Sequence, residues 1–233
     1  MNKHVKNYFK LQPVNLSLIF GMVLVYLYEV IQSFGLIINV DVLFKDGAQY
    51  YHAVVGRGEW WRLLTAGFLH VSPSHLLFNL VVLYFVGKLL EWQIGHLRYL
   101  VLFVLSVMAG NLLSLGTGAM NGVSAGASGG IYGLFGAMIA LGFLDRDNDF
   151  WKREARIIGL LVGLSIFMAL FQSGIDLAAH IGGGIMGMLL TPILLVKNPN
   201  MRQIKINWRL QMVAIIGVVL FVALGFMLAL GRL

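Results

Sequence analysis

Residues 126–136 read GASGGIYGLFG, and residues 179–187 read AHIGGGIMG. Both stretches begin predominantly apolar runs in which glycines recur three or four residues apart, a spacing that places them on one face of a helix. The two faces consist of Gly129, Gly133 and Gly136, and of His180, Gly183, Gly184 and Gly187. A face made of glycine lets the backbone of another helix come very close. We therefore predict that the two segments are helices that pack through these faces.

The composition of the chain excludes a soluble globular protein. Of its 233 residues, 59% are hydrophobic and 12% are charged, against roughly half and a quarter in typical globular domains. Disordered segments are poor in apolar residues and rich in charge, so disorder is excluded as well. The chain has no cysteine, which excludes disulfides, thiol nucleophiles and zinc–thiolate sites. We predict an integral membrane protein.

Seven apolar runs are long enough to cross a bilayer, which requires about 20 residues of helix. They lie at residues 16–36, 75–93, 96–116, 128–144, 157–173, 177–196 and 208–230. We find no internal repeat, and no linker rich in proline, glycine and serine divides the runs. The predicted fold class is an all-α membrane protein, a polytopic helical bundle.

The basic residues favour one orientation of this bundle, because cytoplasmic segments are enriched in lysine and arginine. With the N-terminus inside, the inner segments hold 13 of the 17 basic residues and the outer segments hold 4. The outer four are Lys45, Arg57, Arg62 and Arg232, and the inner ones are Lys3, Lys6, Lys10, Lys88, Arg98, Arg146, Lys152, Arg153, Arg156, Lys197, Arg202, Lys205 and Arg209. The net charge of +7 thus fits loops at an anionic membrane surface and not a nucleic-acid partner. With no organelle transit peptide, this topology predicts a bacterial plasma membrane.

Residues 37–74 form the longest connection, and they place aromatic residues such as Trp60 and Trp61 beside cations such as Arg62. Such residues favour the headgroup level of a membrane. A connection of this length without regular structure is unusual. We therefore expect short helices that lie in the outer interface.

Ser128 and His180 stand near the outer ends of the two glycine-bearing helices. A lone serine in a membrane helix is more often a packing residue. The Gly-x-Ser-x-Gly pattern around Ser128 also lacks the strand and the soluble α/β sheet that a hydrolase nucleophile elbow requires. Packing of the glycine faces, however, would bring Ser128 toward hydrogen-bonding distance of His180. That is the arrangement of nucleophile and base in covalent catalysis, which we favour for this pair.

The motifs resemble those of the rhomboid family of intramembrane serine proteases, in the family's order from about residue 59 to residue 190. The matching elements are Gly126-Ala127-Ser128-Gly129 with Tyr132, Ala179-His180 with Gly183 and Gly187, His75-xxx-Asn79, Trp61-Arg62, and Glu91. The run at 208–230 is similar to the extra helix of the family's six-plus-one members. The resemblance thus implies a six-helix core at 16–200, including the outer segment 37–74. A cytoplasmic segment at 1–15 precedes it, and a linker with a seventh helix at 201–233 follows.

The resemblance implies a serine endopeptidase that cleaves transmembrane protein substrates without a metal or other cofactor. Ser128 would attack the scissile carbonyl, and His180 would take its proton as general base. His75 and Asn79 would form an oxyanion hole with the Ser128 backbone N–H. Tyr132 would stack on His180 or hydrogen-bond to it and so fix the ring.

The remaining matches are expected to be structural. Trp61, Arg62 and His70 would hold the outer loop in the interface. Glu91 would tie the second span to its neighbours through backbone or hydroxyl groups.

Two further acidic residues require an interpretation. Asp176 lies one helical turn before His180, and we interpret it as a helix N-terminal residue favoured by the helix dipole, not as a third catalytic acid. For Glu29 we expect a water-lined position at the outer end of the first span.

Two other functions compete with proteolysis. An inactive rhomboid-like protein would bind membrane clients without cutting them, but such proteins usually lack the serine or the histidine, and both are present here. A seven-span transporter or receptor is the other alternative. Transporters commonly carry paired repeats and broken helices near the midplane, and the sequence has neither such pairing nor suitable central charges.

The charge asymmetry predicts which connections face outward. A reporter fused after residue 120 should be outside, and one fused after residue 200 should be inside. Alkaline phosphatase and green fluorescent protein fusions measure this directly. The reverse pattern would overturn both the topology and an outward-facing Ser128.

Overall fold

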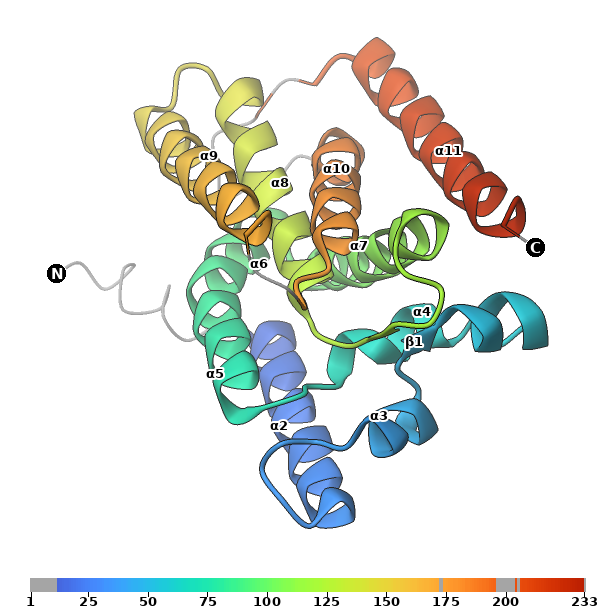
Figure 1. The fold of residues 1–233 in the computed structure, drawn as a ribbon. Coiled ribbons are helices and arrows are strands. Elements are labelled where there is room, and N and C mark those ends of the chain that lie inside the picture. The colour runs from blue at the N-terminus through green and yellow to red at the C-terminus, as the bar shows by residue number, and fades with distance from the viewer. Residues whose placement is uncertain (1–11, 172–173, 196–203, 205, 233) are drawn as a thin grey trace, which may run out of the picture.

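The structure is a computed structural model that describes residues 12–171, 174–195, 204 and 206–232. Within these residues seven long helical segments form a membrane bundle (Figure 1). They are α2 (Pro13–Ser33), the continuous α5 (Pro73–Val82), η3 (Leu83–Gly87) and α6 (Lys88–Ile94), α7 (His96–Thr117), α8 (Ser128–Leu144), α9 (Asp149–Ala169), α10 (Leu177–Leu194) and α11 (Trp208–Leu230). The predicted all-α polytopic bundle is confirmed.

Five of these segments are long and apolar enough to cross a membrane by length and composition alone. The exceptions are α8, which has 17 residues, and α9, whose first two turns carry most of its charges. Both are accounted for by their places in the bundle. α8 is largely buried by its neighbours, whereas α9 packs at the edge of the bundle against α8 (Figure 1).

The first helix starts and ends three residues earlier than the predicted run at 16–36. Pro13 occupies its first turn, and the carboxylate of Glu91 accepts hydrogen bonds from the backbone N–H groups of Val14 and Asn15, at 3.1 and 2.8 Å. These N–H groups have no partner within the helix, so the carboxylate extends the helix toward its N-terminus. The helix ends where Phe34 adopts a left-handed backbone conformation, with φ at +51°.

The fifth helix also differs from its predicted bounds of 157–173. Asn148 caps its N-terminus by accepting a hydrogen bond from the backbone N–H of Phe150 at 3.1 Å. The helix therefore begins at Asp149, and the basic residues that we expected in a loop lie on its first turns. Residues 172 and 173 lie outside the described part of the chain, as does residue 196 at the end of the sixth predicted run.

The centre of the bundle is the contact of α10 with α8 and α7 (Figure 1). A Cβ atom added to Gly183 would collide with the carbonyl group of Gly129, and one added to Gly187 would collide with that of Gly133. On the side of α7, a Cβ at Gly110 would lie 2.5 Å from the carbonyl oxygen of Ala179. The predicted contact between two glycine faces is thus confirmed, and α7 approaches α10 just as closely.

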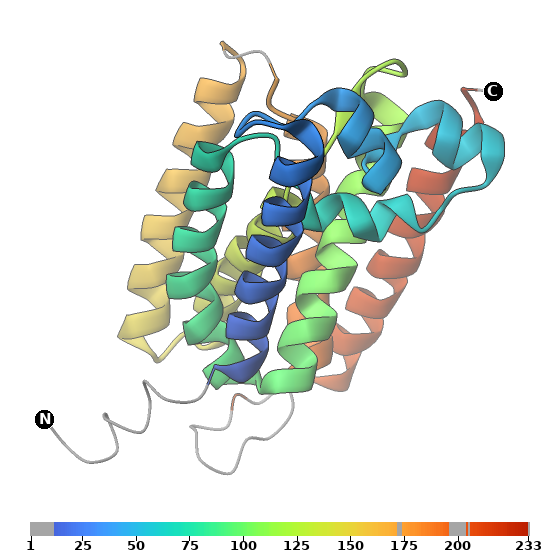
Figure 2. The ribbon, with the colours of Figure 1, turned by 90° about the horizontal axis from the view of Figure 1, so that it is seen from below.

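The segment between α2 and α5 lies across one end of the bundle (Figure 2). It consists of α3 (Val40–Asp46), β1 (Gln49–Tyr50), η1 (His52–Gly56), α4 (Arg62–Thr65) and η2 (Ala66–Phe68). The expected short helices are confirmed. The sequence did not indicate the small antiparallel ladder that β1 forms with β2 (Val123–Ser124), in which Gln49 pairs with Ser124 and Tyr50 with Val123. It arises because partly buried loop backbones must satisfy their hydrogen bonds with each other.

The connections at Gly95 and at residues 145–148 lie at the end of the bundle opposite to this segment (Figure 2). The predicted inner and outer connections, which differ in their number of basic residues, thus lie at opposite ends of the bundle. Six of the predicted inner basic residues lie outside the described part of the chain: Lys3, Lys6, Lys10, Lys197, Arg202 and Lys205. The inside–outside orientation therefore stays a prediction.

Gly183→Ala should destabilise the protein, because its Cβ has no space beside the Gly129 backbone. Overpacking of this kind costs about 1–3 kcal/mol. Gly163→Ala on α9 is the matched control, since a Cβ there meets nothing within 4 Å and alanine is favoured over glycine in a helix by about 0.5–1 kcal/mol. Thermal unfolding in detergent should show a lower Tm for the first variant only. Equal Tm values would contradict the packing.

Candidate active site

Ser128 is the first residue of α8, and the loop before it is held in place by Gly126. Gly126 has φ at +140° and donates its N–H to the carbonyl oxygen of Ala66 at 2.9 Å. A Cβ at this position would lie 2.6 Å from Cε1 of His75. Both the backbone conformation and the lack of space therefore require glycine, and they bring the loop against the α5 helix.

His180 lies in the first turn of α10, directly across the glycine contact from Ser128. Its Nε2 atom is 2.9 Å from Oγ of Ser128, and the contact is partly buried. A general base must lie within about 2.6–3.2 Å of the group from which it takes a proton. The two side chains thus have the geometry of a nucleophile and its base without any rearrangement.

The ring of Tyr132 packs face to face against the ring of His180. The two rings are stacked, with centroids 4.1 Å apart and planes 8° from parallel. The Tyr132 hydroxyl lies 2.6 Å from Oγ of Ser165 on α9. Sequence reasoning missed Ser165, whose one visible signal is a hydroxyl group in an otherwise apolar stretch.

His75 and Asn79 face the same loop from one side of α5, one helical turn apart. The helix begins with Pro73, and the hydroxyl of Ser72 caps it by accepting the N–H of His75 at 3.3 Å. Asn79 is 7% exposed, and its Nδ2 atom has no hydrogen-bond partner among the described residues. A buried amide donor is normally paired, so this one is available to an acceptor placed beside Ser128.

Ser128, His180, Tyr132, His75 and Asn79 line one cavity of about 990 Å³. Its walls come from β2, the loop before α8, and parts of α5, α7 and α10. This volume lies at the upper end of the range for ligand sites. The cavity can therefore hold several residues of an extended peptide beside the Ser128–His180 pair.

The family model for the rhomboid domain matches residues 57–197. The chain belongs to the rhomboid family. The match includes every residue for which a catalytic or oxyanion role is predicted, and it ends before α11.

Several curated rhomboid proteins are similar to this chain. YdcA of Bacillus subtilis (strain 168) is 34% identical over 158 residues, which cover 68% of this chain and 79% of YdcA. The rhomboid protease GluP of the same organism is 33% identical over 64% of this chain, and RHOMBOID-like protein 4 of Arabidopsis thaliana is 34% identical over 62%. The matches span 29% and 36% of those two longer proteins.

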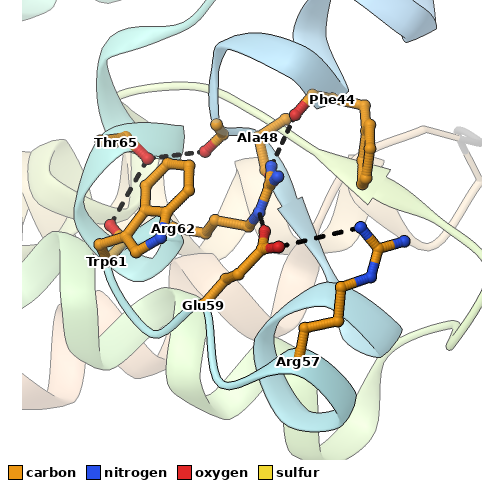
Figure 3. Close-up of polar contacts among 8 residues, drawn as sticks. Phe44, Ala48, Arg57, Glu59, Trp61, Arg62 and Thr65 are labelled. Carbon is orange, nitrogen blue, oxygen red and sulfur yellow. Dashed lines mark hydrogen bonds and ion pairs between the residues drawn. The ribbon is translucent and has the colours of Figure 1, made fainter.

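Arg62 holds together the segment between α2 and α5 of this rhomboid protein (Figure 3). It is 4% exposed, donates to the carbonyl oxygens of Phe44 and Ala48 at 2.6 and 3.0 Å, and pairs with Glu59. Its guanidinium also lies 4.6 Å from the Phe44 ring centroid and 4.7 Å from that of Trp61. A buried cation is stable only when its donors are satisfied, so this set of contacts fixes the fold of the segment.

His70 and Glu29 are more deeply buried than the sequence suggested. Glu29 is fully buried, so the predicted water-lined position is wrong, and it accepts the backbone N–H of His70 at 3.4 Å. His70 is also fully buried and packs edge-on against the His75 ring, with centroids 5.2 Å apart. Burial, and to a smaller extent the nearby His75, lowers the pKa of His70 to about 3, so the ring is neutral near pH 7.

Asp176 caps the N-terminus of α10 by accepting the N–H of Ala179 at 3.0 Å. Its other carboxylate oxygen accepts the hydroxyl groups of Ser114 and Ser124, at 2.6 and 2.8 Å. The sequence identified the cap but not these two serines. Ser114 and Ser124 lie 62 and 52 residues from Asp176 in the sequence. No local sequence pattern could therefore have indicated these two contacts.

Proposed function

We propose that this protein is an intramembrane serine endopeptidase that hydrolyses peptide bonds in or next to transmembrane segments of membrane proteins. The observation that carries the proposal is the 2.9 Å contact between Ser128 Oγ and His180 Nε2 at the wall of a cavity with an unpartnered amide donor. The similarity to the rhomboid protease GluP supports it.

In the first step, Oγ of Ser128 attacks the carbonyl carbon of the scissile peptide bond while Nε2 of His180 takes the hydroxyl proton. The resulting tetrahedral intermediate carries a negative charge on the former carbonyl oxygen. His180 then gives its proton to the amide nitrogen as the C–N bond breaks. The amine product leaves, and the acyl group stays on Ser128.

The oxyanion would be stabilised by donors from two elements. Asn79 Nδ2 and the ring of His75 approach from α5, and the backbone N–H of Ser128 comes from the start of α8. The first N–H groups of a helix lack internal partners and lie at the positive end of its dipole. Donors already in place where charge develops lower the barrier without any cost of reorganisation.

Water completes the reaction. His180 takes a proton from a water molecule, which attacks the acyl carbon, and returns that proton to Ser128 Oγ as the acid product leaves. The loop before α8 is uncharged, consists mostly of small residues and lines the cavity, so water can enter from that end of the bundle. With the N-terminus in the cytoplasm, this end faces outward.

The preferred substrates would be transmembrane segments with small residues and helix breakers near their outer ends. A helix hides its carbonyl groups in hydrogen bonds, so a scissile bond becomes accessible only after local unwinding. Glycine reduces the cost of that unwinding by about 1 kcal/mol and proline by about 3 kcal/mol per residue relative to alanine. The preference for small residues at the cut comes from the rhomboid resemblance.

The proposal is tested by the reactivity of Ser128. A fluorophosphonate probe should label the detergent-solubilised protein at Ser128, with no label in Ser128→Ala and a strong decrease in His180→Ala. The same protein should cleave a glycine-containing transmembrane segment, with a poly-leucine segment of equal length as the resistant control. A folded wild-type protein that is neither labelled nor able to cut would refute the proposal and make Ser128 a packing residue.

Asn79→Ala and His75→Ala should each lower kcat more than they raise KM, because their donors act on charge that exists only in the transition state. Loss of one oxyanion donor typically costs 10²- to 10³-fold in kcat. Leu77→Ala on the exposed face of the same helix is the control and should leave kcat unchanged. A raised KM with unchanged kcat for Asn79→Ala would assign Asn79 to substrate binding instead.

A further inference from the structure

The carboxylate of Asp176 connects three elements around the Ser128–His180 pair. One oxygen accepts the N–H of Ala179 at the start of α10. The other accepts two hydroxyl groups, from Ser114 on α7 at 2.6 Å and from Ser124 on β2 at 2.8 Å. Hydrogen bonds to an ionised acceptor are about twice as strong as neutral ones. One side chain therefore holds α7, β2 and α10 at fixed distances.

These contacts belong to a closed ring made of three side-chain hydrogen bonds and one pair of the β1–β2 ladder. Ser114 also receives a hydrogen bond from the side chain of Gln49 at 3.3 Å. Gln49 is the residue of β1 that pairs with Ser124 of β2 in the ladder. The ring thus runs from Asp176 through Ser114 and Gln49 to Ser124 and back to Asp176.

The ring lies at equal sequence distances from the two predicted catalytic residues. Ser124 precedes Ser128 by four residues, and Asp176 precedes His180 by four. The glycine contact sets the distance between the axes of α8 and α10. Ser128, however, is the first residue of α8, so the loop that enters the helix also determines its position. The bond from Ser124 to Asp176 fixes that loop against the helix that carries His180.

We propose that Asp176 is a positioning residue that sets the separation of Ser128 Oγ and His180 Nε2 through its bond to Ser124. The effect on reaction rate rests on the function proposed above, whereas the effect on geometry does not. A displacement of about 1 Å in a catalytic group can lower a rate roughly 10²-fold. The proposal thus gives Asp176 an effect on rate without direct contact with reacting atoms.

The proposed role differs from that of the acid in a catalytic triad. A triad acid acts on the histidine ring through its negative charge, whereas the oxygens of Asp176 accept from a backbone N–H and two serines. An asparagine can accept from Ala179 with its oxygen and donate to the serine oxygens with its nitrogen. Asp176→Asn would therefore keep the hydrogen bonds at this position and remove the negative charge.

The test compares the rate of fluorophosphonate labelling of Ser128, per folded molecule, among four variants. Asp176→Ala and Ser124→Ala should each lower the rate about 10- to 100-fold, and Asp176→Asn should stay within about threefold of the wild type. Ser114→Ala is the matched control, because it removes a hydroxyl from the same carboxylate oxygen but leaves the bond to Ser124. It should lower Tm without a comparable loss of rate.

Three outcomes would overturn the proposal. A loss in Asp176→Asn as severe as that in Asp176→Ala would mean that the charge acts directly. Equal losses in Ser114→Ala and Ser124→Ala would mean a general effect on the bundle. Unchanged rates with lowered Tm in Asp176→Ala and Ser124→Ala would make the ring purely structural.

A second readout does not depend on catalysis. The ¹⁵N resonance of His180 Nε2 reports its hydrogen bond to Ser128, and Ser128→Ala defines the resonance without that bond. In Asp176→Ala the resonance should move to the Ser128→Ala position, and in Asp176→Asn it should stay at that of the wild type. An unmoved resonance in Asp176→Ala would overturn the positioning role. If the wild type proved unreactive while the resonance moved as expected, the protease proposal would fail and the positioning role would stand.

Discussion

The structure depends on a contact between α8 and α10 in which the two backbones meet through glycines. Lipid tails are as apolar as leucine, so burying apolar side chains does little to bring helices together in a bilayer, and close backbone packing must contribute instead. Gly129, Gly133, Gly183 and Gly187 make that packing possible. The glycine contact is therefore the centre of the bundle, and it places Ser128 beside His180.

Around this contact, charged groups hold the irregular parts of the chain in place. Arg62 bonds to the backbone carbonyls of Phe44 and Ala48, Glu91 to the first N–H groups of α2, and Asp176 to groups from α7, β2 and α10. In an apolar environment an unpaired polar group costs several kcal/mol. A small number of charged side chains with complete sets of partners can thus define loops that lack a hydrophobic core. This accounts for a site built partly on loops that still has the short distances that chemistry requires.

The proposed mechanism uses two catalytic residues because the environment supplies what a third would do. In a triad the acid holds the histidine ring in its orientation. Here the stacked ring of Tyr132 does so, and its hydroxyl is held by Ser165. A neutral aromatic ring avoids a further buried charge, which is costly within a membrane. Asp176 stays at the helix terminus, where its charge is satisfied by donors.

The sequence by itself indicated the membrane class, the seven helices and the glycine faces. Its motifs also singled out the candidate site residues Ser128, His180, Tyr132, His75 and Asn79. Composition, helical periodicity and the spacing within a short motif are properties of neighbouring residues. All of them can therefore be read from the sequence without the fold. Only the tertiary structure decided where α2 begins, that β1 pairs with β2, that Glu29 is buried, and that Ser114, Ser124 and Ser165 support the site. Each of these depends on a partner far away in the chain, such as Glu91 for Asn15, 76 residues apart. A hydrogen bond between residues so far apart leaves no periodic pattern in the sequence, because only the packing of the helices brings its donor and acceptor together.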